Sequence, residues 1–109
     1  MLFRSAASQP SGPTASLTAD SPRIVAKDIR FTTPTATAPA NRAFAIDFDN
    51  QESVPHNISI DAPDGKNVFK GEIFNGSAHR VYSIPALAAG TYAFKCDVHP
   101  DMKGTLMVS

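Results

Sequence analysis

The sequence predicts an all-β domain, built as an antiparallel Greek-key β-sandwich or barrel. Short stretches of alternating apolar and polar residues recur at regular spacing, and turns rich in Pro, Gly, Asn and Asp separate them. No long stretch carries the 3.6-residue periodicity of an amphipathic helix. With 109 residues and 42% hydrophobic residues, the chain has the size and composition of one small globular domain.

The first 21 residues differ in composition from the rest. Residues 1–21 are rich in Ser, Ala, Thr, Pro and Gly and offer almost nothing to bury, which is typical of a linker or a disordered arm. We therefore expect 1–21 to be a flexible linker or leader and 22–109 to be the folded domain. Two origins of the arm stay open. It is either a tether to a membrane anchor or neighbouring domain in a parent protein, or a vector-derived leader.

Two strands and a proline-containing run are predicted next. Residues 23–31 alternate loosely and precede a Thr-, Pro- and Ala-rich run over 32–40. Pro34 and Pro39 should keep that run from pairing as a central strand, because proline lacks the N–H that a ladder needs. Residues 44–49 form the clearest strand, since Phe and Ile alternate with Ala and Asp to give one apolar face and one wet face.

The rest of the chain contains four further predicted strands. The first covers residues 54–60 and carries His56, and a turn at 61–67 and a short irregular excursion at 68–76 follow it. The remaining strands are expected at 79–84, 91–96 and 105–108. His79 has the same parity as Val81 and is expected on the surface, opposite the core-facing side chains of its strand.

The stretch that says most about chemistry is residues 94–104, FKCDVHPDMKG. It places a thiol, an imidazole and a thioether three residues apart, at Cys96, His99 and Met102. Cys96 is the only cysteine, so it cannot form an internal disulfide. A soft thiolate beside a soft thioether suits copper better than magnesium, calcium or most zinc sites. The stretch is therefore a candidate copper-binding loop.

His56 would complete the ligand set from a different strand. Alternate side chains of a strand share one face, so Cys96 shares a face with Tyr92 and Phe94, which mark it as buried. By the same count, His56 points to the side of the apolar residues that follow it in its strand. Both candidate ligands should therefore point into the core. A trigonal His-Cys-His set with a distant axial Met is the arrangement that carries electron-transfer copper.

These residues give the chain a resemblance to the cupredoxins, the small blue copper proteins, over residues 22–109. The strongest match is residues 90–102, GTYAFKCDVHPDM, whose Cys-x2-His-x2-Met spacing is similar to that of amicyanins and shorter than that of plastocyanins, pseudoazurins and azurins. The segment Pro55-His56-Asn57 resembles the family's first-ligand segment. The binuclear copper domain of the oxidase second subunit needs two cysteines, and this sequence has one.

The resemblance implies one copper ion per chain and an electron carrier rather than an enzyme, cycling between Cu(II) and Cu(I). The implied metal ligands are His56, Cys96 and His99 in the equatorial plane and Met102 as the weak axial ligand. Asn57 resembles the residue of the cupredoxin family whose backbone N–H donates a hydrogen bond to the sulfur of the ligand cysteine. Asp97 and Val98 depart from the small residues, Thr or Pro, that are common after the cysteine, which leaves the reduction potential open.

The expected partners and cellular location of the protein follow from this resemblance and from the charge of the chain. Redox partner proteins are expected to dock transiently near His99, the implied port for electrons. The ten basic and ten acidic residues are scattered along the sequence, so the sequence has no cluster of basic residues of the kind that binds nucleic acid. No segment approaches the ~20 apolar residues of a membrane span, and the start lacks a signal peptide. We expect a monomer in the periplasm or another extracytoplasmic location, either free or tethered in a parent protein. For such an exported domain, the sequence is either an excised or engineered piece, or one whose leader has been removed.

Three of the four candidate ligands also have an ordinary structural explanation. Cys96 could be a small buried hydrophobe, His56 a satisfied core histidine and Met102 a filler of core gaps. A structural zinc site is disfavoured because such sites use several Cys and His ligands and rarely a thioether. A Cys–His nucleophilic enzyme is disfavoured because the sequence offers no orienting third group. The alternative function is a copper-delivery module or the tethered electron-entry domain of a larger copper oxidoreductase.

Overall fold

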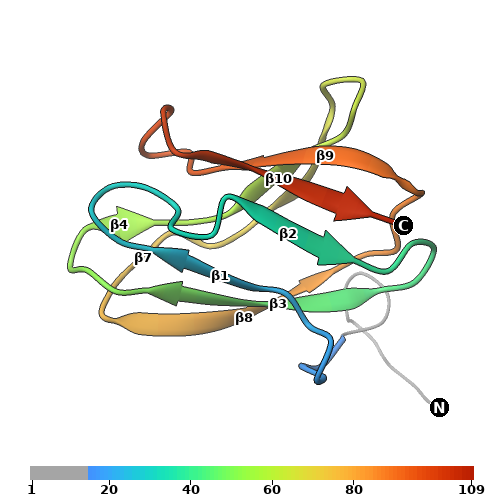
Figure 1. The fold of residues 1–109 in the computed structure, drawn as a ribbon. Coiled ribbons are helices and arrows are strands. Elements are labelled where there is room, and N and C mark those ends of the chain that lie inside the picture. The colour runs from blue at the N-terminus through green and yellow to red at the C-terminus, as the bar shows by residue number, and fades with distance from the viewer. Residues whose placement is uncertain (1–14) are drawn as a thin grey trace, which may run out of the picture.

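The computed structural model describes residues 15–109, which form ten strands (Figure 1). The strands are β1 (Arg23–Ala26), β2 (Thr35–Ala38), β3 (Phe44–Asn50), β4 (Pro55–His56), β5 (Ser59–Asp61), β6 (Asn67–Lys70), β7 (Phe74–Asn75), β8 (Ala78–Ile84), β9 (Gly90–Lys95) and β10 (Lys103–Val108). Within this part of the chain, no helix is long and apolar enough to cross a membrane.

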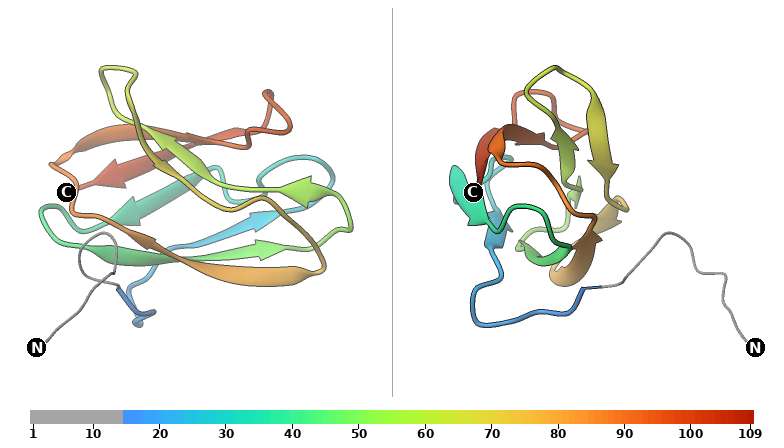
Figure 2. Two further views of the ribbon diagram at one scale, coloured as in Figure 1. Left: turned by 180° about the vertical axis from the view of Figure 1, so that it is seen from behind. Right: turned by 90° about the vertical axis from the view of Figure 1, so that its right-hand side faces the viewer.

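Two sheets pack face to face and a small third sheet lies at one end. The first has the strand order β1-β3-β8 and the second has the order β2-β10-β9-β5-β6. Figure 2 shows the two sheets facing each other, and β4 pairs with β7 at the end of the sandwich away from the C-terminus. The predicted all-β sandwich is confirmed.

The sheets are mixed, whereas the sequence predicted antiparallel pairing throughout. β1 runs parallel to β3 and β2 runs parallel to β10, while the other paired strands are antiparallel. The reason is the path of the chain: after β1 it crosses to the other sheet as β2 before it returns as β3. Such a crossover can bring parallel strands together, whereas a hairpin cannot. Alternation along one strand does not reveal which strand becomes its neighbour.

The first strand is shorter than predicted. The backbone of Asp28 and Ile29 has φ angles of 58° and 55°, in the left-handed region that a strand cannot contain. β1 therefore ends at Ala26. The following run does contain a strand, β2, which lies between Pro34 and Pro39 at the edge of its sheet. An edge position agrees with the prediction that these prolines exclude the run from the centre of a sheet.

The middle of the chain also differs in detail from the prediction. The strand expected at 54–60 is divided into β4 and β5. The excursion expected to be irregular at 68–76 contains β6 and β7. Because β4 pairs with β7 rather than with either large sheet, His56 lies at the end of the sandwich instead of within a long strand.

The core between the sheets fixes the strand that leads to the cysteine. Phe94 in β9 is fully buried, and its ring meets the edge of Phe31 with 5.0 Å between centroids. On β10, a Cβ at Gly104 would collide with the Phe94 ring, so glycine is required opposite Phe94. The other large apolar side chains of the sheets that are fully buried are Ile24, Ile46, Phe48, Ile60, Ile84 and Leu106.

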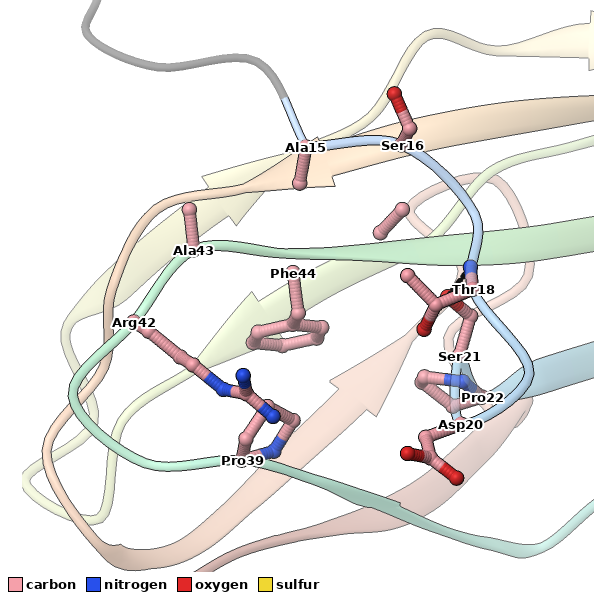
Figure 3. A pocket seen from close by; sticks show the side chains of 11 residues that line it. Ala15, Ser16, Thr18, Asp20, Ser21, Pro22, Pro39, Arg42, Ala43 and Phe44 are labelled. Atoms are coloured by element: carbon pink, nitrogen blue, oxygen red, sulfur yellow. Dashed lines mark hydrogen bonds between the residues drawn. The ribbon is translucent and has the colours of Figure 1, made fainter.

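Residues 15–22 cross the other end of the sandwich, near the start of β3. The N–H of Ala15 donates to Ser83 Oγ at 2.8 Å, and a shallow pocket lined by Pro22, Arg42 and Phe44 lies under this segment (Figure 3). The boundary expected between residues 21 and 22 stays a prediction, and residues 1–14 lie outside the described part of the chain. His79 is exposed, as predicted.

Candidate metal centre

The fold brings three of the predicted ligands together at the β4 end of the sandwich. Nδ1 of His56 lies 3.7 Å from Cys96 Sγ, and Nδ1 of His99 lies 3.7 Å from the same sulfur. The three donor atoms all lie within 4.8 Å of one another. His56 and Cys96 are fully buried, whereas His99 is half-buried. Residues 40 positions apart in the sequence thus form one compact donor set.

The spacing of these atoms fits a transition-metal ion. Metal–nitrogen bonds of about 2.0 Å and metal–sulfur bonds of about 2.3 Å are typical for such ligands, and an angle of about 120° between them places the two donors about 3.7 Å apart. Both observed nitrogen–sulfur distances are 3.7 Å. Thiolate and imidazole are also the donors that copper prefers. The chemistry of the three donors and both nitrogen–sulfur distances therefore fit a copper ion.

His56 is held by a carboxylate that the sequence analysis did not identify. Its Nε2 lies 2.6 Å from Oε2 of Glu52, in the turn before β4. An ionised carboxylate can only accept hydrogen bonds, so Nε2 carries the proton and the lone pair of Nδ1 faces the sulfur of Cys96. Hydrogen bonding at the outer nitrogen is how proteins fix the tautomer of a metal-binding histidine. The only sequence signal was an acidic residue four positions before His56.

Glu52 is itself fixed from two directions. The backbone N–H of Ile29 donates to Oε2 of Glu52 at 3.0 Å, and the N–H of Glu52 donates to Oδ1 of Asn50 at 3.2 Å. Burial raises the pKa of Glu52, but the hydrogen bonds from His56 and Ile29 outweigh it, so the pKa lies below its ordinary value. Ile29 has a left-handed backbone conformation, which is unusual for a β-branched residue. Its N–H contacts Glu52, the residue that holds His56.

Asn50 ties this support to the sandwich. Its side chain is fully buried, and Nδ2 donates to the carbonyl oxygens of Val54 at 2.9 Å and Phe74 at 3.1 Å. These bonds join the end of β3 to the residue before β4 and to β7. Because β4 and β7 pair with each other, Asn50 fixes the frame from which His56 projects.

Cys96, His99 and Met102 lie on the loop between β9 and β10. The N–H of Met102 donates to the carbonyl of His99 at 2.8 Å, and the N–H of Cys96 donates to the carbonyl of Met102 at 3.1 Å. These bonds close the loop on itself. The side chain of Met102 is only 1% exposed, so it lies inside the protein beside a buried cysteine. Its role as the axial ligand stays a prediction.

An ion pair anchors the start of this loop to the sheet. Nζ of Lys95 lies 2.8 Å from Oδ2 of Asp61, at the end of β5. Hydrogen bonds from Lys95 and from Asn67 lower the pKa of Asp61, and the bond to Asp61 raises the pKa of Lys95. Exposed ion pairs of this kind contribute little to stability, because solvent screens them. The pair therefore positions the start of the loop and contributes little to the stability of the domain.

A second link joins the loop to the bend between β4 and β5. Asn57 is fully buried, and its Nδ2 donates to Oδ2 of Asp97 at 2.9 Å and to the carbonyl of Gly71 at 3.0 Å. In return, the backbone N–H of Asp97 donates to Oδ1 of Asn57 at 2.8 Å. The residue after the cysteine is thus clamped to the residue after the first histidine. The N–H contact to sulfur expected of Asn57 stays a prediction.

Comparison with known proteins agrees with this geometry. Residues 1–108 match the family described as the cupredoxin-like domain. Amicyanin-alpha of Methylorubrum extorquens is 32% identical over 92 residues, which are 83% of this chain and 73% of that protein. A reduced amicyanin variant superposes with a TM-score of 0.66 and 25% identity, over 92% of this chain and 95% of that one.

Auracyanin from Roseiflexus castenholzii shares the fold, with a TM-score of 0.71 over 87% of this chain and 98% of that one, at 19% identity. The family match covers nearly the whole chain, the sandwich is the same, and the donor set is the one that copper prefers. The chain belongs to the cupredoxin family, is similar to the amicyanins in sequence, and holds a single copper ion.

Proposed function

We propose that this protein carries single electrons at a mononuclear type 1 copper site. The bound copper supplies the redox chemistry, because it exchanges one electron between Cu(II) and Cu(I). His56, Cys96 and His99 would hold it, and Met102 would be the fourth, weak ligand. No substrate bond is made or broken, and the protein is an electron carrier rather than an enzyme.

The observation that carries this proposal is the donor set of one thiolate and two imidazoles, closed on its inner side by the core. A trigonal His-Cys-His set with a weak axial thioether is diagnostic of electron-transfer copper. Cys96 and His56 are fully buried, so water has no access from that side. Hydrogen bonds from the framework and within the loop hold the ligand atoms in place, which favours a small change of geometry when an electron is exchanged.

His99 is proposed as the port through which electrons enter and leave. Among the three donor residues it is the one that reaches the surface, between exposed Val98 and exposed Pro100. Val98 is 39% exposed and gives the surface beside the port an apolar side chain. Zero net charge provides no strong long-range steering. Partner proteins are therefore expected to dock on a monomer here through weak, small contacts.

The proposed domain is residues 22–109, with residues 1–21 as a linker or leader, in a periplasmic or other extracytoplasmic setting. The support is that the donor residues and their supporting side chains all follow residue 22. Removal of residues 1–20 should leave the copper spectrum intact and the thermal midpoint nearly unchanged. A fall of many degrees would show that this segment contributes to the packing of the domain.

The spectrum of the copper-loaded protein tests the proposal. The wild-type protein should bind one copper ion per chain and show intense thiolate-to-Cu(II) absorption. Cys96→Ser should abolish that band while circular dichroism still reports a folded β domain. Persistence of the band in Cys96→Ser, or a colourless wild-type protein with stoichiometric Cu(II), would overturn the blue copper assignment.

A further inference from the structure

We infer that the carboxylate of Asp97 is a positioning and potential-setting residue that favours Cu(II) over Cu(I) at this site. The inference rests on the proposed function, since it concerns the metal held by Cys96. Asp97 directly follows the cysteine, and Oδ2 accepts a hydrogen bond from Nδ2 of fully buried Asn57 at 2.9 Å. The carboxylate of the residue after the cysteine is thus held by a buried side chain rather than free in solvent.

Asp97 and Asn57 form hydrogen bonds with each other in both directions, and this clamp fixes the position of the Asp97 carboxylate. The backbone N–H of Asp97 donates to Oδ1 of Asn57 at 2.8 Å, while Nδ2 of Asn57 also donates to the carbonyl of Gly71. Asn57 therefore cannot rotate without breaking three hydrogen bonds. The carboxylate is consequently held against the bend between β4 and β5 by the Asn57 side chain.

The charge is only partly neutralised by its neighbours. Nζ of Lys70 lies 3.6 Å from Oδ2 of Asp97, and that lysine side chain is 67% exposed whereas the Asp97 side chain is 21% exposed. A flexible, exposed ammonium group is well screened by solvent, and the carboxylate lies in a region of lower dielectric constant. The negative charge therefore has a larger effect on the metal than the positive one.

The direction of the effect follows from Coulomb's law. Oxidation adds one positive charge at the metal, and a nearby fixed negative charge stabilises the more positive state. Asp97 therefore lowers the reduction potential. The side chain is also a hydrogen-bond acceptor, so charge and position must be separated experimentally. Asp97→Asn does this, because an amide oxygen can still accept the hydrogen bond from Asn57 while the charge is lost.

The test is voltammetry of copper-loaded variants, after their absorption spectra and circular dichroism have been compared. Asp97→Asn should raise the Cu(I)-to-Cu(II) affinity ratio about tenfold, which is about 59 mV upward for one electron. Asp101→Asn is the matched control, because it removes the same charge from an exposed position of the same loop. Its ratio should change less than about threefold, since solvent and salt screen an exposed charge.

Lys70→Gln provides an independent arm that leaves the loop sequence intact. Loss of the partner cation should lower the potential, by less than Asp97→Asn raises it. Equal shifts in Asp97→Asn and Asp101→Asn, or a potential unaffected by both Asp97→Asn and Lys70→Gln, would overturn the inference. These outcomes differ from failure of the proposed function, in which the wild-type protein itself would lack the blue absorption. If Asp97→Asn does not fold, a Lys70→Gln potential that is unchanged or raised overturns the inference by itself.

Discussion

The metal centre has two sides that are built in different ways, a framework side and a loop side. On the framework side, His56 is fully buried in β4, and its outer nitrogen is held by Glu52. On the loop side, Cys96, His99 and Met102 come from one short segment that is closed by its own backbone hydrogen bonds. His99 is half-buried there. One side is therefore part of the sandwich, and the other is a loop that is held by its own backbone hydrogen bonds and by two links to the sandwich, Lys95–Asp61 and Asn57–Asp97.

The difference indicates a division of labour between the two sides. The framework side orients a ligand through Glu52 and Asn50, neither of which is a predicted metal ligand. The loop side supplies most of the donors and also the surface through which a partner would reach the site. The two sides meet at the clamp between Asn57 and Asp97. Substitutions on the framework side should therefore act on metal affinity, and those on the loop side on potential and partner access.

The largest effect is expected when the framework side is broken at Glu52. Glu52→Ala removes the acceptor for Nε2 of His56, and loss of such a partner typically costs about 10–100-fold in metal affinity. Copper affinity should be measured by competition with a chelator of known affinity. Glu52→Gln should lose less, because its amide oxygen can still accept the hydrogen bond from Nε2.

Glu72→Ala is a suitable control for the Glu52 variants. The side chain of Glu72 is 69% exposed and pairs with Arg80 across the surface, so its removal should leave copper affinity unchanged. If Glu52→Ala and Glu72→Ala bind copper as tightly as the wild-type protein, the carboxylate does not orient His56 and the framework side is less specific than the geometry indicates.

A smaller effect is expected on the loop side at Met102. An oxygen donor stabilises Cu(II) more than a thioether does, so Met102→Gln should keep the blue absorption while lowering the reduction potential. A tenfold change in the Cu(I)-to-Cu(II) ratio corresponds to about 59 mV, which voltammetry resolves easily. An unchanged potential would mean that Met102, which is buried, only packs in the core and is not the axial ligand.

The sequence predicted the loop side much better than the framework side. Cys96, His99 and Met102 are close in sequence, so their spacing was informative before any contact was known. His56 was found by strand parity, although its strand is broken after two residues and the burial of Asn57 interrupts the alternation. Glu52 and Ile29 could not be found, because their contacts with each other and with His56 depend on how the turns fold back.

The same limit explains the errors in the fold. Alternation predicted a strand at residues 44–49, and β3 covers Phe44–Asn50, because one face of a strand is encoded by its own residues. Parallel pairing of β1 with β3 and of β2 with β10 is a property of the chain path between distant segments. Local patterns carry no information about that path, so the architecture was predictable and the sheet order was not.

The smallest and most specific effect should appear when the loop side is altered at its surface without touching a ligand. Pro100 is exposed and follows His99, so Pro100→Glu places a charge beside the proposed port. The absorption spectrum should survive, while the rate of electron exchange with a surrogate redox protein should fall several-fold, because desolvating the new carboxylate opposes docking. Met107→Glu is the matched control: it adds the same charge at a residue that is 42% exposed in β10 and opposite Thr91, away from the loop. Equal electron-exchange rates for the two variants, with both spectra intact, would show that electrons do not enter near His99. The loop side would then not be the surface on which partners dock.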